Sequence, residues 1–566
     1  MQQERKPPSS LAPRGEPGAA PLANPGSRPE LPRVGARFWP AISADPPAAP
    51  APAPRPGHQA SPSCDVVVVG AGIAGLTAAG LLARAGLQVE LLEAHHQSGG
   101  CAGTFRRGPY VFDVGATQVA GLEAGGIHQR LFEHLNVTPP AAEPLDPGCV
   151  VDLGDGRAPV RILRAPERWR QERQCQFPGS ERFWRLCEAI HQANWAFAAR
   201  EPVLPPRSLW DLGQLLGALG GGNLLSGLLT TASIADLQNL CGCGSDRRLR
   251  RFLDLQLRLY SQEPAQRTAA LYGATVLSMV QEPLGLWHLQ GSMQALAEAL
   301  EQGLAQAGGR LRLRHRVTRL EPAGEAGRWT VHGEAPGRAG FVLKAGDVVV
   351  TVPPQSLPEL LGDQLPSGYR RRLEQLPEPS GALVFYGAIA RSQLPPACAS
   401  HLQLDWGDPG PLFVSISQEG DGRAPAGQAT VIASVFTPAR AWFEGDEASY
   451  QARKQNAMAG IQAGLAQLLQ LRSQSWIHRE LATPRGFAGW TGRPWGWVGG
   501  LGQHPLRFGP FGLASRTPLP GLWLCGDSIH PGEGTAGVSL SALMACRQLL
   551  QRHGQELTIG SPAHRP

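Results

Sequence analysis

A strand, a glycine-rich turn and a helix follow one another near residue 70, and no other feature of the chain constrains its fold as strongly. Residues 65–69 (DVVVV) are a run of β-branched side chains that predicts a buried strand. Residues 76–85 are rich in Ala and Leu and predict a helix, and the turn between them, residues 70–75, reads GAGIAG. A second predicted strand, residues 88–92, ends at Glu93.

This unit has the parts that a dinucleotide-binding site requires. Gly70 permits the tight turn, Gly72 lets the backbone approach a pyrophosphate, and Gly75 lets the helix pack closely on the strand. The helix N-terminus offers free N–H groups and the positive end of its dipole to the phosphates. Glu93, 18 residues after Gly75, is placed to hold a ribose diol. The sequence therefore predicts dinucleotide binding.

Two further segments indicate which dinucleotide is bound. Residues 93–104 read EAHHQSGGCAGT, and the glycine pair at 99–100 brings a second loop over the pyrophosphate. Enzymes that bind only a nicotinamide cofactor do not usually require such a loop. Near the other end, a predicted strand over 521–525 runs into Gly526-Asp527, and an Ala- and Leu-rich helix follows over 539–550.

These two ends resemble the FAD-binding segments of the flavin amine oxidase and phytoene desaturase superfamily. The resemblance implies that Asp527 contacts the ribityl–phosphate part of FAD and that the backbone of Val317 contacts adenine. It also implies that the last helix, starting at Gly537-Val538, points its dipole at the flavin C2 carbonyl, which stabilises the anionic reduced flavin. The residues expected to hold FAD are Gly70, Ala71, Gly72, Ile73, Ala74, Gly75, Glu93, Ala94, Gly99, Gly100, Cys101, Thr104, Val317, Gly526, Asp527, Gly537 and Val538.

A third block matches the same superfamily in the middle of the chain. Residues 291–293 (GSM) lead a predicted helix at 294–307, and predicted strands follow at 310–317 and 347–352. The resemblance implies an α/β fold, in which a Rossmann-type FAD-binding domain is discontinuous in sequence and carries an inserted mixed α+β substrate domain. The expected parts are a disordered leader at 1–63, an FAD-binding domain at 64–165, 284–355 and 510–555, a substrate domain at 166–283 and 356–509, and a flexible tail at 556–566.

The residue after the second glycine pair points to one branch of the superfamily. Gly-Gly-Cys at 99–101, in place of Gly-Gly-Arg, resembles the carotenoid isomerases, retinol saturases and carotenoid desaturases. Together with the stretches at 112–121, 125–128, 489–494 and 526–534, it makes the chain most similar to the carotenoid 3′,4′-desaturases of photosynthetic bacteria. The implied reaction removes a hydride from an allylic carbon to flavin N5 and a proton from its neighbour, which extends a C40 polyene.

Such a reaction needs positioning and a modest base, because polyene conjugation stabilises the developing cation. The candidates near the expected flavin are Glu533, His530, Glu123 and His128. Each is equally explained as a hydrogen bonder that stabilises a loop. Trp490, Trp495 and Trp497 are candidates to line a polyene tunnel or to form an aromatic core. Cys525 suggests covalent flavin attachment, but packing inside a strand explains it more simply.

The sequence is compatible with more than one electron acceptor and more than one reaction. Gly500-Leu501-Gly502 resembles a second nucleotide fingerprint, but Pro505 stands where its third glycine is needed. We therefore expect no NAD(P)H site and an external acceptor, either oxygen or a quinone. The alternatives to desaturation are a carotenoid cis–trans isomerase that uses reduced FAD, a flavin amine oxidase, and a flavoprotein scaffold without turnover.

A charge-free segment and an arginine-rich segment suggest contact with a membrane. Moving a forty-carbon polyene through water would cost on the order of 30 kcal/mol, so such an enzyme must draw its substrate from the bilayer. Residues 212–235 carry no charged side chain, and Arg247, Arg248, Arg250 and Arg251 follow them in the sequence. We expect these two segments to form a docking face, whereas a buried helical hairpin is the alternative for 212–235. Nowhere do 18 apolar residues follow one another, so no transmembrane helix is predicted.

Composition adds limits on location and partners. Residues 1–63 hold 16 of the 52 prolines and no apolar h-region, so we expect disorder and no signal peptide. The net charge of +6 has no dense basic block, which argues against nucleic acid. Cys241 and Cys243 lack a second pair, so no metal is expected, and the ten cysteines suit a reducing compartment. The expected place is the cytoplasmic side of a membrane.

Overall fold

The computed structural model of the chain describes residues 63–220, 227–324, 328–337, 340–471 and 476–560. All of these lie in one compact unit, Ala41–Pro566. The predicted leader therefore lies outside the described residues, except for Ser63, which begins the first strand.

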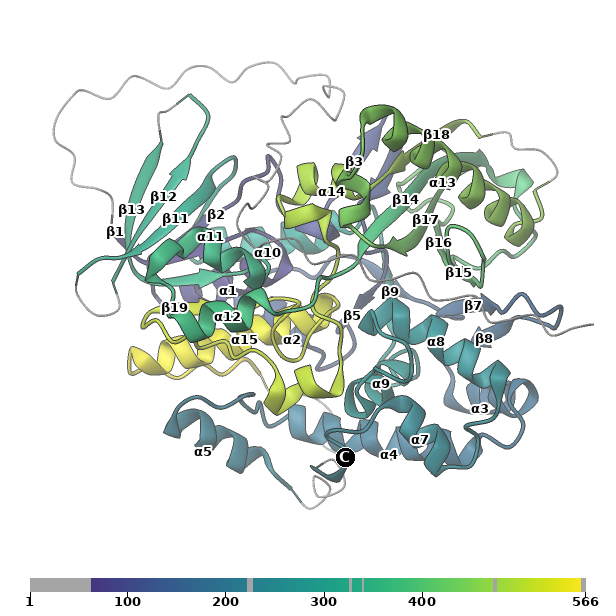
Figure 1. The fold of residues 1–566 in the computed structure, drawn as a ribbon, viewed down its shortest axis with the longest axis horizontal. Coiled ribbons are helices and arrows are strands. Elements are labelled where there is room, and N and C mark those ends of the chain that lie inside the picture. The colour runs from purple at the N-terminus through teal and green to yellow at the C-terminus, as the bar shows by residue number, and fades with distance from the viewer. Residues whose placement is uncertain (1–62, 221–226, 325–327, 338–339, 472–475, 561–566) are drawn as a thin grey trace, which may run out of the picture. The chain divides into compact units, whose positions relative to one another are not determined.

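The first of two large sheets in the described residues includes the strand that precedes the glycine-rich turn (Figure 1). Its strand β1 (Ser63–Val69) pairs in parallel with β2 (Val89–Leu92) on one side and with β13 (Phe341–Val350) on the other. Residues 66–69 are nearly inaccessible, as expected for a central parallel strand covered on both faces. The order is β10-β2-β1-β13-β12-β11, with β19 also pairing β13. The other strands are β10 (Arg310–Arg312), β11 (Arg316–Pro322), β12 (Trp329–Glu334) and β19 (Leu522–Leu524).

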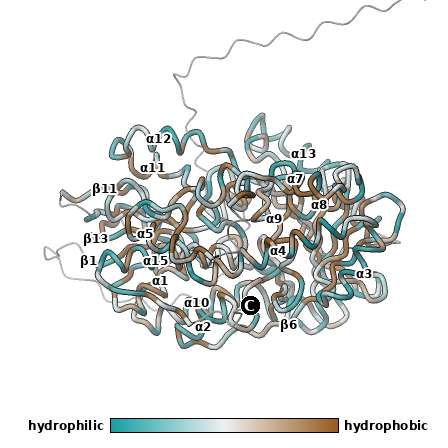
Figure 2. Tube along the Cα trace, turned by 90° about the horizontal axis from the view of Figure 1, so that it is seen from below, coloured by the Kyte–Doolittle hydropathy of each residue, from teal (hydrophilic) through white to brown (hydrophobic). Residues whose placement is uncertain are grey.

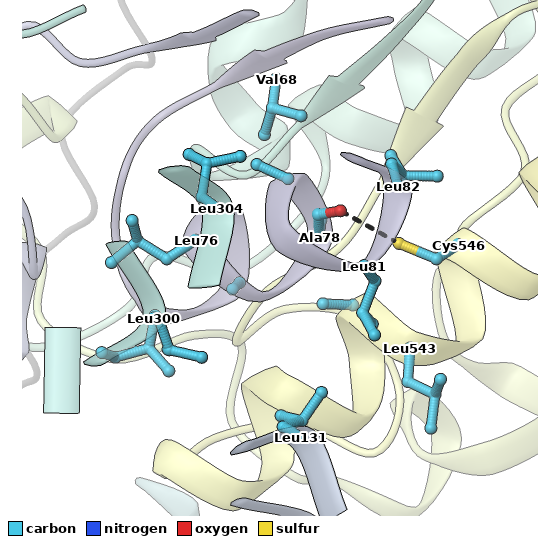
Figure 3. Close-up of a cluster of buried hydrophobic side chains, with 14 of the residues drawn as sticks. Val68, Leu76, Ala78, Leu81, Leu82, Leu131, Leu300, Leu304, Leu543 and Cys546 are labelled. Carbon is cyan, nitrogen blue, oxygen red and sulfur yellow. Dashed lines mark hydrogen bonds between the residues drawn. The ribbon is translucent and has the colours of Figure 1, made fainter. Parts of the chain in front are cut away.

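Four helices share the core beside this sheet. They are α1 (Ile73–Arg84), α2 (Ile127–Leu135), α10 (Gln294–Gln306) and α15 (Thr535–Arg552). Figure 3 shows their side chains meeting around α1, where Leu81 lies near Leu543 of α15 and Leu76 lies near Leu300 of α10. The thiol of Cys546 donates to the carbonyl of Ala78 at 3.6 Å, which ties α15 to α1. Each fully buried leucine contributes about 1.5–3 kcal/mol, so α1 and α15 stabilise each other.

The second large sheet has the order β18-β14-β17-β16-β15-β7-β8. Alternate residues of β14 (Gly381–Ala390) divide between its two faces. Leu383 and Phe385 belong to the core on the face that α13 (Glu447–Leu468) covers. Ala382 and Val384, which alternate with them, lie on the other face. The remaining strands are β7 (Cys149–Asp152), β8 (Val160–Ile162), β15 (His401–Leu404), β16 (Leu412–Ile416), β17 (Gln428–Thr437) and β18 (His478–Ala482).

A group of helices with its own core forms the lower right of Figure 1. Its members are α3 (Pro166–Gln176), α4 (Glu181–Ala198), α7 (Ile234–Leu240), α8 (Arg247–Ser261) and α9 (Ala270–Leu277). The smaller elements are β3 (Thr104–Arg107), β4 (Tyr110–Asp113), β5 (Val119–Ala120), β6 (Ala142–Pro144), β9 (Leu286–Leu289), α5 (Leu209–Ala218), α11 (Leu357–Leu361), α12 (Ser367–Glu374) and α14 (Pro484–Thr491).

Three sequence predictions differ from the observed elements. The strand predicted at 310–317 is two strands, because Arg314 adopts φ = 60° and separates β10, which pairs with β2, from β11, which pairs with β12. The last helix begins at Thr535, two residues before Gly537. β7 and β8 lie in the segment assigned to the FAD-binding domain, yet they pair in the second sheet.

Candidate cofactor and substrate site

A cavity of about 380 Å³ is lined by segments that lie far apart in the sequence. One part of its wall consists of the glycine-rich turn, Glu93, the second glycine pair and Gly526-Asp527. The other part is mostly apolar and comes from α8, α9, β9 and the second sheet. The cavity therefore joins the predicted nucleotide-binding motifs to an apolar chamber.

The glycine-rich turn has the geometry that its sequence predicts. Gly70 adopts φ = 99°, which side chains rarely adopt. A Cβ on Gly75 would lie 1.8 Å from the carbonyl oxygen of Gly70, so only glycine fits there. A Cβ on Gly72, in contrast, would meet no protein atom within 4 Å, although Gly72 lines the cavity beside Ile73 and Ala74. The open side of Gly72, at the N-terminus of α1, is where an anionic group can approach the backbone.

Glu93 lies at the end of β2 and touches this turn. One carboxylate oxygen accepts from the backbone N–H of Ala71 at 2.7 Å, and the other from that of His95 at 2.8 Å. Burial raises the pKa of Glu93, and these hydrogen bonds oppose the shift. Each oxygen retains a lone pair for a further donor such as a ribose hydroxyl.

The second glycine pair lies directly on the first turn. Gly99 and Gly100 adopt φ values of 99° and 58°, and the N–H of Gly99 donates to the carbonyl of Ala71 at 2.8 Å. A Cβ on Gly100 would stand 3.5 Å from the Cα of Gly72. The indole N–H of Trp490 donates to the carbonyl of Gly100 at 3.3 Å, which fixes this loop against α14.

Asp527 forms an ion pair with Arg493 at the wall of the cavity. The guanidinium also donates to the carbonyl of Gly499 at 2.7 Å. Val538, in the first turn of α15, lines the same cavity. The aspartate that the resemblance assigns to FAD thus lies beside a cation from the stretch at 489–494, and the sequence did not predict this ion pair.

Some residues predicted to hold FAD lie outside the cavity wall. Gly75 and Gly537 pack against backbone, since a Cβ on Gly537 would stand 2.6 Å from the carbonyl of Gly532. The hydroxyl of Thr104 donates to Asp113 at 3.0 Å in a buried network. Val317 lies in β11, packed against the core of the first sheet. The others outside the wall are Ala71, which braces Glu93, and Ala94.

Glu533 is the catalytic candidate that lines the cavity. Its Oε1 accepts from the side-chain amide of Gln262 at 2.7 Å and from the backbone N–H of Gly500 at 3.2 Å. Its Oε2 is buried and has no hydrogen-bond partner among the described residues. Burial first, and then the charge of Asp527, raise the pKa of Glu533 to about 8, although Gln262, Gly500 and Arg493 oppose the shift.

The other three candidates lie outside the cavity wall. His128 is fully buried; Nδ1 lies 2.8 Å from the carbonyl of Ala120 and Nε2 lies 3.2 Å from the hydroxyl of Ser539 in α15. Glu123 accepts from the backbone N–H of Gly121 at 3.1 Å. The ring of His530 packs 5.2 Å from that of Phe508, and burial lowers its pKa to about 4. His128 and Glu123 therefore act as braces of the loop at 120–126.

Most of the aromatic and sulfur candidates also have structural places. Trp490 lines the cavity, but Trp497 is buried elsewhere and Trp495 packs against Phe443. Cys525 follows β19, is buried in the core and lies outside the cavity wall, which agrees with simple packing. Among the described residues, no group of three or more His, Cys, Asp or Glu is placed to hold a metal ion.

The apolar chamber is built from helices on one side and a sheet face on the other. Tyr260 and Leu259 come from α8, and Tyr272 and Val276 come from α9. The opposite wall uses alternate residues of the second sheet, whose other face packs on α13. These residues are Ala382, Val384, Phe413, Ser434 and Phe436. The strand alternation that sorts side chains between the two faces thus produces an apolar wall.

Similarity to known proteins identifies the family. Residues 73–550 match the family described as flavin containing amine oxidoreductase. The chain belongs to this family. Its members contain a flavin, and FAD is the cofactor of this enzyme. The open side of Gly72, the carboxylate of Glu93 and the wall at Gly526-Asp527 fit such a dinucleotide, because they offer backbone donors, a ribose acceptor and room for close approach.

Individual relatives are distant, and two of the three described here span most of the chain. Hydroxyneurosporene desaturase of Cereibacter sphaeroides is 28% identical over 86% of this chain and 97% of its own length. The chloroplastic prolycopene isomerase of Arabidopsis thaliana is 24% identical over 88% and 85%. All-trans-retinol 13,14-reductase of Danio rerio is 28% identical, but the match spans less than half of either chain, 48% and 46%.

Solved structures show the same fold. Wild-type putrescine oxidase bound to putrescine superposes with a TM-score of 0.59 at 17% identity, covering 88% of this chain and all of the oxidase. Cyclohexylamine oxidase from Brevibacterium oxydans gives 0.54 at 17% identity, covering 86% and 100%. The predicted FAD-binding α/β fold with a substrate domain is confirmed.

Proposed function

We propose that this flavin oxidoreductase is a carotenoid desaturase that forms the 3′,4′ double bond of a C40 polyene. The observation that carries the proposal is the shape of the cavity, in which the glycine-rich wall continues into an apolar chamber. Such a chamber suits a hydrocarbon better than a soluble amine, whose ammonium group would lose its hydration without a paired charge. The names of the two relatives that span most of the chain, a desaturase and an isomerase, support the same substrate class.

The chemistry divides between the cofactor and the protein. FAD, when bound, would supply the hydride acceptor at N5, with oxygen or a quinone as the external acceptor of the two electrons. Glu533 is proposed to take the proton from the neighbouring carbon, because it is the acidic candidate that lines the cavity beside the apolar chamber. The substrate then gains one C=C bond, and the apolar wall excludes water from the site.

Redox-neutral isomerisation is the second candidate function. The prolycopene isomerase covers as much of the chain as the desaturase does, and the same cavity would hold either substrate. Burial and the charge of Asp527 raise the pKa of Glu533 to about 8, so its carboxylate and protonated forms are both present near neutral pH. The carboxylate can remove a proton and the carboxylic acid can return one, which suits either reaction.

Product analysis separates these functions. The FAD-loaded protein would be incubated anaerobically with liposomes that contain a candidate carotene and a quinone, and the carotenoids analysed by mass and by retention time. A mass loss of two hydrogens supports desaturation. An unchanged mass with a changed retention time supports isomerisation instead. Unchanged carotenoids together with oxidation of a soluble amine would overturn the proposal in favour of an amine oxidase.

Peripheral membrane contact is part of this proposal, and α5 is the surface that supports it. Its residues Leu209, Leu212 and Leu216 share a helix face and expose 89%, 41% and 58% of their surface, and Figure 2 shows the hydrophobic residues along this helix. The acidic residue of α5, Asp211, is buried and contacts Arg516. Residues 221–226 of the predicted docking segment at 212–235 lie outside the described residues. No helix in the described ranges is long and apolar enough to cross a bilayer.

Two of the four arginines in the predicted docking face, Arg248 and Arg250, make contacts within the fold. Arg248 pairs with Asp155 and donates to Gln176 at 2.7 Å, and Arg250 donates to Gln238 at 2.6 Å. Both side chains therefore hold α8 in place, and their replacement would damage the fold. Leu212→Glu with Leu216→Glu is the sharper test, with Ile477→Glu as a matched control on an exposed apolar residue of another region. We expect the α5 variant to lose co-sedimentation with anionic liposomes and the control to keep it; equal binding of both would refute the docking helix.

A further inference from the structure

Gln262 occupies a strained place at the C-terminus of α8. Its backbone adopts φ = 57°, in the left-handed region that non-glycine residues rarely adopt. The side chain leaves the helix end and reaches three other segments of the chain, at 380, 498–500 and 533. A residue held in this way is fixed by its contacts rather than by local preference.

The amide of Gln262 joins these segments through both of its polar atoms. Its nitrogen donates to Oε1 of Glu533 at 2.7 Å and lies 3.1 Å from the carbonyl oxygen of Gly500. Its oxygen accepts from the backbone N–H of Ser380 at 2.9 Å. Because the oxygen is occupied by a donor, the amide can present only its N–H groups to Glu533.

The backbone at Gly499 lets the two side chains meet. A Cβ on Gly499 would stand 1.7 Å from Oε1 of Glu533 and 2.1 Å from the amide nitrogen of Gln262, so the two side chains meet directly over this glycine. The second carboxyl oxygen, Oε2, is left without a partner among the described residues. One oxygen of Glu533 is thus held, and one is available for a proton.

We propose that Gln262 is a positioning residue, which holds Oε1 of Glu533 so that Oε2 exchanges the proton of the reaction. This deepens the proposed function and rests on the role that it gives Glu533. The charged and titratable groups that face Glu533 are Asp527, Arg493, Tyr272 and Cys101. None of them replaces the hydrogen bond of Gln262, which favours the carboxylate form and so keeps the proton labile.

Gln262→Asn is the variant that isolates this contact. Asparagine tolerates the left-handed backbone, but its side chain is one methylene shorter and cannot reach Glu533. The matched control is Gln256→Asn, because Gln256 is a buried glutamine of the same helix that donates to Gln403 at 2.6 Å. A purely structural loss lowers stability in both variants alike.

The measurement is an infrared titration of the protonated carboxyl band in the resting FAD-loaded protein, with no carotenoid present. The band assigned by its loss in Glu533→Gln should titrate near pH 8, should move up by about one pH unit in Gln262→Asn, and should not move in Gln256→Asn. The acid limb of the activity profile should follow the same shift. An unmoved band in Gln262→Asn, or no band lost in Glu533→Gln, overturns the inference. A shifted band without turnover of carotenes would leave Gln262 as the partner of Glu533 but refute the proposed function.

Discussion

Replacing two glycines of the same turn should separate cofactor binding from folding. Gly72→Ala adds a methyl group where no protein atom lies within 4 Å, at φ = −70°, which alanine adopts without strain. Gly75→Ala, three residues later, places its methyl carbon 1.8 Å from the carbonyl oxygen of Gly70. The first change enters the space proposed for FAD, whereas the second enters the protein itself.

The expected magnitudes differ accordingly. Gly72→Ala removes the N-cap glycine of α1, which costs about 0.5–1 kcal/mol of stability in the apoprotein. If the added methyl group displaces one charge-assisted hydrogen bond to the pyrophosphate, about 1.5–3 kcal/mol of binding is lost, or roughly 10- to 140-fold in affinity. Gly75→Ala requires the turn to move by more than about 1 Å and should cost 3 kcal/mol or more, a large share of the total stability of a typical domain.

Two measurements on purified apoprotein test this pair. Thermal unfolding by circular dichroism reports the fold, and quenching of flavin fluorescence reports the dissociation constant for FAD. Gly213→Ala is the control, since its methyl group also meets no protein atom within 4 Å and α5 does not line the cavity. Wild-type FAD affinity in Gly72→Ala would refute the placement of the pyrophosphate at this turn. A native unfolding temperature in Gly75→Ala would refute the steric argument.

Three further perturbations follow from buried groups and from the cofactor. Burial and the charge of Asp527 raise the pKa of Glu533 to about 8, so the folded protein holds a proton that the unfolded chain releases above pH 4.5. Stability should therefore fall as the pH rises from 4.5 to 8, and this fall should be absent in Glu533→Gln. Unfolding temperatures across pH 5–9 test this, and an equal fall in the variant contradicts it. Burial lowers the pKa of His128 to about 4 from 6.5, so stability should fall as pH drops through that window, and His128→Gln should flatten the dependence; an unchanged slope contradicts the buried neutral imidazole. FAD at 100 times its dissociation constant should stabilise the apoprotein by about 2.7 kcal/mol, and an unchanged unfolding curve would contradict specific binding.

Local patterns made one part of the site predictable. The turn at 70–75 and the strand that precedes it are specified by neighbouring residues, because the steric need for glycine at Gly75 arises from Gly70 itself. Gly526-Asp527 and the following helix are likewise a short contiguous pattern. These motifs also predicted the fold, since the strands next to them, β1, β2 and β19, all lie in the first sheet.

Contacts between distant segments were not predictable. Gln262 belongs to no local pattern, and the stretch at 489–494 that contains Arg493 indicated a branch of the superfamily but not an ion pair. The roles of both residues arise only when the segments near 493, 262 and 533 approach one another. The sequence also did not distinguish the role of Glu533 from that of Glu123. A glutamate that stabilises a loop and a glutamate that lines a cavity have the same appearance in a sequence. The break at Arg314 follows from the backbone N–H of Arg314 and that of His315, which donate to the carbonyls of His95 and Glu93.

The pairing of β13 has a consequence for biosynthesis. β1 is synthesised early, but β13, which pairs with it, follows only after about half of the chain. Val349 of β13 pairs in turn with Trp523 of β19, which is synthesised later still. Until then the growing chain carries the glycine-rich turn beside an unpaired strand edge, which is open to aggregation. Non-local pairing of this kind also folds slowly. A nascent chain that stops before residue 522 lacks both β19 and the helix that covers α1, so we expect it to be a client of chaperones and unable to retain FAD, although every residue of the turn is already present.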